Sequence, residues 1–375
     1  MKKYIFVILV LLACLFSIIN TSGWGIAYET PYKTNVLISF WCLFLIGKGR
    51  FVHAIEYNSI LAFFTLLSFV ILPWLTADSW DGFTYLMMVP LVYCFSEQKY
   101  SYEALRLSGY AVAFWGLAVL FVYSRTGILS GWNDNQISMI GLFSYIYYSI
   151  SLYGNMSGRK FSIGIAISIL YILMLNATQS RSAIIFIVVA VLLAYSGGTF
   201  QKLIKRKKFL FYALNLPLFI SLFFIFLPGL FIFQYFEEWS LQHFGKSAMN
   251  GRDILWMEGY ERLCNSYFIG EGEFLINHHN SAVAVISVFG VVGYICWYKL
   301  LAKPLKFMLH YVDDNLMFGF VTSFFLIFWQ QSFDLGFISA SPNMIPYVIL
   351  GLGLARARVL KKRKKNVQEV LVETK

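Results

Sequence analysis

Charged side chains are scarce in this sequence: Asp, Glu, Lys and Arg together make up 13% of its 375 residues, whereas soluble domains carry roughly 25%. Hydrophobic residues make up 59% and gather in many runs of about 18 to 20 residues, the length that crosses a bilayer as a helix. This composition excludes a soluble globular protein. It predicts an all-α polytopic membrane protein, because no other open structure satisfies its backbone in lipid.

Cysteine is also sparse, and its spacing carries no metal-binding motif. The five cysteines are scattered, with no CxxC pair among them, so we expect neither a disulfide framework nor a zinc site. Four of them lie in apolar runs, and the fifth, Cys264, lies in a polar loop; the four are Cys14, Cys42, Cys94 and Cys296.

About twelve apolar segments run along the chain as one polytopic membrane domain, 1–375. The first begins just after Met1, Lys2 and Lys3 and has no clear small-x-small cleavage site, so we interpret it as an uncleaved helix rather than a signal peptide. The predicted spans cover residues 4–19, 34–47, 59–76, 82–96, 107–124, 136–153, 161–177, 182–197, 209–235, 280–300, 316–333 and 337–355.

The basic residues predict the orientation of these spans. The net charge of +11 comes from Lys and Arg in short loops, a pattern that indicates membrane topology rather than a nucleic-acid surface. With the N-terminus inside, the inner segments hold 24 of the 30 basic residues. Both termini are then cytoplasmic, including a basic tail at 356–375. The runs at 202–208 and 361–365 are interpreted as anchors at anionic lipid.

One long segment, 236–280, is polar and lies on the outer side in this topology. Within it, residues 250–263 have a partly apolar face that predicts a short helix against the bundle. Gly270 and Gly272 allow a tight turn, after which His278, His279 and Asn280 lead into the tenth span. A membrane protein that keeps one large polar loop against its helices usually uses it for chemistry or binding.

Two arginines on the outer side are candidates for binding an anion. Arg181 opens the eighth span, where a charge is costly unless it pairs or faces a polar cavity. It is either snorkelling to the interface or a fixed cation whose planar fork suits a diphosphate. Arg252 lies where the predicted loop helix begins, at Asn250 or Asp253. It is either a second such cation or a solvated surface pair with Asp253, which would contribute little.

The outer end of the tenth span carries the candidate base. An imidazole titrates near working pH and serves as a general base. Of the two histidines, His279 is the candidate, and for it a functional role is favoured over a purely structural one. Adjacent histidines do not share one helical face, so His278 and His279 are not expected to bind a metal together. Asn280 is either the helix N-cap or a residue that orients the imidazole.

Other outer-side residues give weaker signals. Arg125 and residues 132–136 form another outer polar loop, in which Trp132 could stack on a sugar ring; an interfacial aromatic belt is the slightly favoured interpretation. Arg262 beside Glu261 is a possible supporting residue or a solvated pair. A second carboxylate is available at Asp78, Asp81 or Asp334, and nothing in the sequence chooses among them.

The order of these motifs resembles the superfamily of O-antigen ligases and O-antigen polymerases of the Wzy type. Its members show an Arg in a T-x-S-R context opening a helix, an Arg followed by an apolar-Trp segment in the large loop, and His-Asn leading a helix that contains G-x-x-G. Here these are Thr178 to Arg181, Arg252 to Trp256, and His279-Asn280 with Gly290 and Gly293. The match covers residues 176–298, and His278 has no counterpart in it.

This resemblance implies a bundle similar to GT-C glycosyltransferases and an inverting, metal-independent glycosyl transfer without a cofactor. The donor would be an undecaprenyl-diphosphate-linked glycan at the outer face of the bacterial inner membrane. Arg181 and Arg252 would hold the diphosphate, and His279 would activate the acceptor hydroxyl. Preplaced cations that stabilise the leaving diphosphate would take the place of a metal ion.

Three functions are open at this stage. A polysaccharide polymerase joins lipid-linked repeats, and it is favoured over an O-antigen ligase that moves the finished chain to a lipid A core. A lipid-linked glycan transporter is the third, but the spans are nearly free of charge and the two halves show no repeat. Expected partners are the lipid-linked oligosaccharide, membrane lipid, a chain-length regulator and a flippase of the same pathway, with no nucleic acid.

Overall fold

The protein is described by a computed structural model that covers residues 2–21, 38–39, 59–126, 134–153, 158–178, 180–195, 197–226, 231–244, 247, 249–274, 278–334, 336, 338 and 342–373. The regular secondary structure of these ranges is entirely helical, with no β-strand, so the predicted all-α class is confirmed for this part of the chain. The predicted span 34–47 lies outside the described residues except for Ile38 and Ser39.

In the described part of the chain, four helical stretches are long and apolar enough to cross a membrane. They are Ile60–Ala77, which joins α5 (Ser59–Leu66), η1 (Leu67–Ile71) and α6 (Leu72–Ala77); α9 (Tyr102–Thr126); α14 (Phe209–Phe226); and α17 (Ser281–Leu309). A fifth is present if α12 (Arg181–Tyr195) and the bent α13 (Gly197–Ile204) form one span. The membrane character of the chain is therefore supported by several apolar helices.

The predicted count of about twelve spans is not confirmed by these helices. Several apolar segments form shorter helices, among them α10 (Asp134–Ser149), the stretch Ser162–Thr178 that joins most of α11 (Gly158–Leu175) to η2 (Asn176–Thr178), and α18 (Asn315–Gln330). The predicted span 82–96 is divided at Met87 into α7 (Asp81–Leu86) and α8 (Met88–Ser96). The last predicted span, 337–355, begins later than expected, because α19 covers Ile345–Glu373. This helix continues through most of the basic tail.

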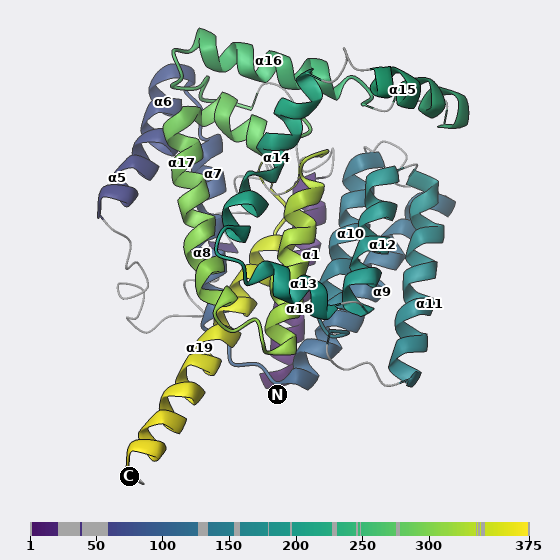
Figure 1. Cartoon of the computed structure of the whole chain (residues 1–375), viewed down its shortest axis with the longest axis vertical. Helices are drawn as coiled ribbons and strands as arrows, with labels where there is room; N and C mark the ends of the chain where they lie inside the picture. Colours follow the sequence, from purple (N-terminus) through teal and green to yellow (C-terminus); the bar gives the residue numbers. More distant parts are fainter. Residues whose placement is uncertain are drawn as a thin grey trace.

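The two ends of the chain lie at the same end of the molecule, and the helices of the polar loop lie at the other. Figure 1 shows α1 (Lys2–Thr21) rising from the N-terminus, α19 descending to the C-terminus, and α15 (Phe231–Phe244) and α16 (Arg252–Asn265) lying across the opposite end. Between these ends, α10 and α18 are buried along almost their whole length. The end that carries α15 and α16 is called the loop end below.

A proline ties α14 to α18. Pro217 lies inside α14 and has no N–H to donate, so the carbonyl four residues before it has no helical partner. That carbonyl, of Ala213, instead accepts a hydrogen bond from the indole Nε1 of Trp329, at 3.0 Å. The helix therefore continues through the proline while its spare acceptor is satisfied by a neighbouring helix.

Glycine in a left-handed conformation lets the loop lie against α17. Gly290 has a φ of 68° inside α17 and breaks its helical path. The released carbonyls of Ser287 and Val288 accept from the N–H groups of Glu271 and Gly272, at 2.9 and 2.8 Å. A Cβ on Gly290 would lie 2.2 Å from a loop carbonyl, so only glycine permits this contact. The segment that follows α16 is therefore held firmly on the break in α17.

Candidate functional site

The imidazole of His279 faces the carboxylate of Asp334 at the loop end. The His279 Nδ1 and Asp334 Oδ1 atoms are 3.3 Å apart, and the side chains are 21% and 4% exposed. His279 has a φ of 48°, an uncommon conformation for a residue other than glycine and one that clusters at functional sites. A buried carboxylate thus stands behind a partly accessible imidazole, an arrangement that holds a histidine in one orientation for proton transfer.

Arg252 belongs to the same electrostatic cluster. It is the first residue of α16, after Gly251 in a left-handed conformation. Burial lowers the pKa of its guanidinium, the negative charge of Asp334 opposes that shift, and the positive charge of Arg181 adds to it. Its Nε atom is buried and has no hydrogen-bond partner in the described part of the chain. Arg181, Arg252 and the His279–Asp334 pair therefore form one site, called the outer site below.

Arg181 fastens α12 to the polar loop. It begins α12, and its Nη1 donates to Ser240 Oγ of α15 at 3.0 Å while its Nη2 donates to the Ser247 carbonyl at 3.2 Å. Arg181 thus reaches the polar loop that also carries Arg252.

Asn280 is the N-cap of α17 rather than an orienting partner of the imidazole. Its Oδ1 accepts from the N–H groups of Ala282 and Val283, at 2.9 and 3.2 Å. Its Nδ2 donates to the carbonyls of Pro217 and Ser332, at 2.9 and 3.2 Å. The amide is fully buried and uses both of its ends in structural contacts. It holds the start of α17 in place, and so fixes the position of His279.

His278 is a buried residue of the packing beneath α16. Its side chain is 3% exposed, it lies against Gly259 of α16, and its carbonyl accepts from the indole of Trp256 at 2.7 Å. Neither ring nitrogen has a hydrogen-bond partner among the described residues. Burial lowers the pKa of this imidazole to about 4, so it is neutral at working pH.

Arg262 does not pair with Glu261, as the sequence suggested, but with two other carboxylates. It contacts Glu258 and Glu271, in each case at 2.9 Å. These hydrogen bonds raise the pKa of Arg262. Adjacent residues on a helix point in different directions, whereas residues four apart lie on one face, which explains the choice of Glu258. Arg262 therefore joins α16 to the following turn rather than supplying a cation for a ligand.

Arg125 lies in the last turn of α9 and is exposed. Within the described residues it makes no hydrogen bond or ion pair with any member of the outer site. Trp132, which was considered with it, lies outside the described residues. Arg125 is therefore not brought together with the other candidates.

The structure distinguishes among the three carboxylates that the sequence left open. Asp81 accepts from the backbone N–H of Phe274 at 3.0 Å and so holds the loop. Asp78 ends α6 in a left-handed conformation. Asp334 contacts His279. The sequence showed Asp334 only as an acidic residue at the outer end of a predicted span, 55 residues from His279.

Searches for similar proteins add nothing to this picture. No protein-family model matches the chain, and no curated protein or solved structure is significantly similar to it. Among the described residues, no group of three or more His, Cys, Asp or Glu side chains is arranged to hold a metal ion. The functional argument therefore rests on the outer site itself.

Proposed function

We propose that this protein is a membrane glycosyltransferase that polymerises a bacterial surface polysaccharide. It joins glycan repeats carried on undecaprenyl diphosphate at the outer face of the inner membrane. The observation that carries the proposal is the outer site, in which two arginines and a histidine–carboxylate pair meet at the end of the bundle opposite both termini. This combination suits a reaction with an anionic leaving group and a hydroxyl nucleophile.

The two arginines fit the leaving group. Breaking the bond between a sugar and a lipid diphosphate develops charge on the diphosphate, and preplaced cations stabilise that charge in the transition state. Arg252 has a buried Nε without a partner, a donor that a phosphate oxygen would satisfy. Asp334 offsets only part of the cost of burying Arg252, whose pKa stays lowered beside the positive charge of Arg181, so a diphosphate bound at these arginines would stabilise the buried cation further.

The histidine fits the nucleophile. With Nδ1–H directed at Asp334, the basic nitrogen of a neutral His279 is Nε2. That nitrogen takes the proton of an acceptor hydroxyl as its oxygen attacks the anomeric carbon. The bond from that carbon to the diphosphate breaks, and undecaprenyl diphosphate leaves with the bonding electrons. A single displacement of this kind inverts the anomeric centre.

A ligase and a polymerase would share this donor chemistry and differ in the acceptor. The outer site is compatible with either, and the superfamily motifs do not separate the two. Polymerase is preferred because the chain is rich in aromatic residues, at 19%, as such polymerases commonly are. A glycan transporter is less well matched, because the polar groups gather at the loop end rather than along the middle of the spans. A flippase and a chain-length regulator are the expected pathway partners.

The test is a gel profile of the surface glycan from the host after deletion of this gene, repeated with wild type, Arg181→Ala and His279→Ala supplied in trans. A product limited to one repeat on its normal acceptor supports the polymerase. Long chains stranded on the lipid carrier identify a ligase instead. An unchanged profile in a host that makes such a glycan refutes both transferase assignments.

A further inference from the structure

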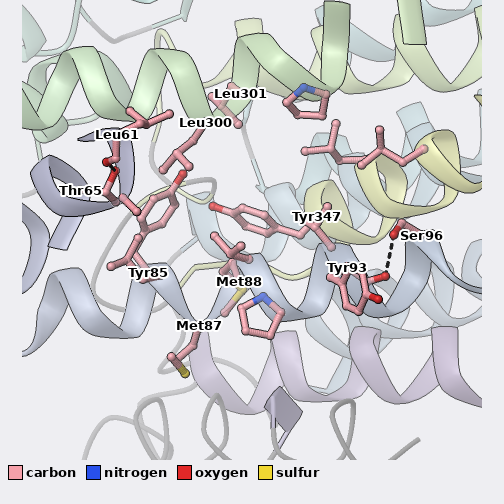
Figure 2. Close-up of a pocket in the computed structure, with 18 of the residues that line it drawn as sticks. Leu61, Thr65, Tyr85, Met87, Met88, Tyr93, Ser96, Leu300, Leu301 and Tyr347 are labelled. Carbon is pink, nitrogen blue, oxygen red and sulfur yellow. Dashed lines mark hydrogen bonds between the residues drawn. The ribbon is translucent and has the colours of Figure 1, made fainter. Parts of the chain in front are cut away.

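A cavity lies away from the outer site, between α5, α7, α8, α17 and α19. Its volume is about 390 Å³, within the roughly 300–1,000 Å³ common for small-ligand sites. Figure 2 shows Thr65 and Tyr85 towards one end of the cavity and Ser96 towards the other, with Tyr347 projecting between them. None of the residues of the outer site lines it.

The walls of this cavity are almost entirely apolar. Most of its length is formed by aliphatic side chains and methionines, among them Leu61, Met88, Leu300, Leu301, Leu350 and Leu354. The hydroxyls of Thr65 and Ser96 donate to carbonyls of their own helices, Leu61 and Tyr93, at 2.7 Å each. These two hydroxyls are thus already satisfied, and the mainly apolar wall suits a long hydrocarbon chain rather than a sugar or a nucleotide.

One end of the cavity carries a cation with unused donors. Arg358 of α19 lines the cavity and uses only its Nη1, which donates to the Ser96 carbonyl and hydroxyl at 3.2 and 3.1 Å and to Glu97. Its Nε and Nη2 make no hydrogen bond to any described residue. These two atoms form one edge of the guanidinium, the edge that binds a phosphate in a bidentate manner.

The surroundings add positive charge and an entrance from lipid. Lys361 and Lys362 follow Arg358 by one turn of α19 and are exposed. Their two positive charges outweigh the negative charge of Glu97, which pairs with Arg358. On the flanking helix α5, Ile60 and Phe63 are 62% and 59% exposed, as expected of side chains that contact acyl chains. Leu66 of α5 lines the cavity and is itself 53% exposed, so a lipid that enters beside α5 would have its charged part at the basic end.

From these observations we infer that the cavity binds one acyl chain of an anionic glycerophospholipid, whose phosphate is held by Nε and Nη2 of Arg358. The basic end lies towards the termini and not towards the loop end (Figure 1), which separates this lipid from a donor bound at the outer site. The site is structural or regulatory, and the inference does not depend on the proposed glycan transfer.

The experiment uses the purified full-length protein in detergent micelles that contain either palmitoyl-oleoyl phosphatidylglycerol or the matching phosphatidylcholine. The phosphatidylglycerol carries a diazirine in its acyl chain for photolabelling. We expect phosphatidylglycerol to raise the unfolding midpoint above its value in phosphatidylcholine and to label residues of α8 or α19 that line the cavity. Unlabelled undecaprenyl phosphate is added as a competitor.

Two variants with matched controls locate the effect. Arg358→Gln should lose the preference for phosphatidylglycerol, whereas Arg363→Gln, on the same helix but not in the cavity, should keep it. Ala62→Trp fills the cavity and should lose the labelling, whereas Phe63→Trp on the exposed face should keep it. Each midpoint difference is taken within one variant, so a general loss of stability does not imitate the result.

Three outcomes overturn the inference. Equal unfolding midpoints of the wild type in the two lipids would show that the site does not recognise the anionic headgroup. Labelling that is confined to exposed faces, or that is unchanged in Ala62→Trp, would show that the acyl chain does not bind in the cavity. Displacement of the label by undecaprenyl phosphate at concentrations where excess unlabelled phosphatidylglycerol has no effect would assign the cavity to the polyprenyl lipid instead.

Discussion

Replacing Asp334 with asparagine tests the pairing on which the proposed mechanism depends. The change keeps the size of the side chain and removes its negative charge. In the wild type the carboxylate would stabilise the imidazolium that forms when His279 takes the acceptor proton. Over the observed 3.3 Å, an effective dielectric constant of about 20 gives an interaction of about 5 kcal/mol, which is an upper limit because the imidazole is 21% exposed.

That energy converts into a rate. Each 1.36 kcal/mol of lost transition-state stabilisation is about tenfold, so Asp334→Asn should slow transfer by roughly 10²- to 10⁴-fold, the range attributed to general base catalysis. An amide that turns its NH₂ towards Nδ1 would also favour the wrong tautomer of His279. Substrate affinity should change less than the rate, since the arginines remain.

The assay is the initial rate of glycan transfer in liposomes, with lipid-linked repeats isolated from the deletion strain as substrate. Asp78→Asn is the matched control, because Asp78 is an outer carboxylate that ends α6 and has no contact with His279. It should retain the wild-type rate, and asparagine tolerates its left-handed conformation. If Asp334→Asn also retained that rate at a normal protein level, the histidine–carboxylate account of the base would be refuted.

Three further predictions concern the neighbours of this pair. Arg181→Lys should lose most transfer activity at a normal protein level, because a point charge cannot replace a guanidinium that contacts Ser240 and the Ser247 carbonyl with separate nitrogens; near-full activity in the same liposome assay would remove Arg181 from the site. His278 has a folded pKa of about 4 against an ordinary 6.5, so the unfolded chain binds the extra proton between these values and stability should fall as the pH drops from about 6.5 to about 4, by roughly 3 kcal/mol at most. Unfolding measured across this pH range should show that loss in wild type and in His310→Gln but not in His278→Leu, and equal slopes in all three would contradict it. Asn280→Ala removes an N-cap and leaves two buried carbonyls with one donor fewer, so it should destabilise the protein by about 2 kcal/mol or more; an unchanged unfolding midpoint would show that the cap contributes little.

Local sequence signals predicted the start of α17 well. Asn280 stands directly before an apolar run, the usual place for an N-cap, and the structure confirms that role. The two glycines after α16 were predicted to make a turn, and both have positive φ. Their partner at Gly290 was known only as part of a motif, because the contact between the turn and the break in α17 joins distant parts of the chain.

Long-range partners were beyond the sequence. Asp334 could not be chosen over Asp78 and Asp81, because only the packing of α17 beside the end of α18 brings it to His279. The ion pair of Arg262 was predictable in part, since Glu258 lies four residues before it and Glu261 does not share its face. Hydropathy predicted more long spans than the described helices confirm, because it records apolar character but not the ends of helices such as α7 and α8 on either side of Met87.

The most direct test of the proposed function is elongation by the purified protein alone. The full chain is placed in liposomes with undecaprenyl-diphosphate-linked repeats from the deletion strain, and the lipid-linked products are measured by mass spectrometry. Wild type should form products of two or more repeats and release undecaprenyl diphosphate, while His279→Ala forms neither. Elongation by His279→Ala at the wild-type rate, or no elongation by wild type, would contradict the account.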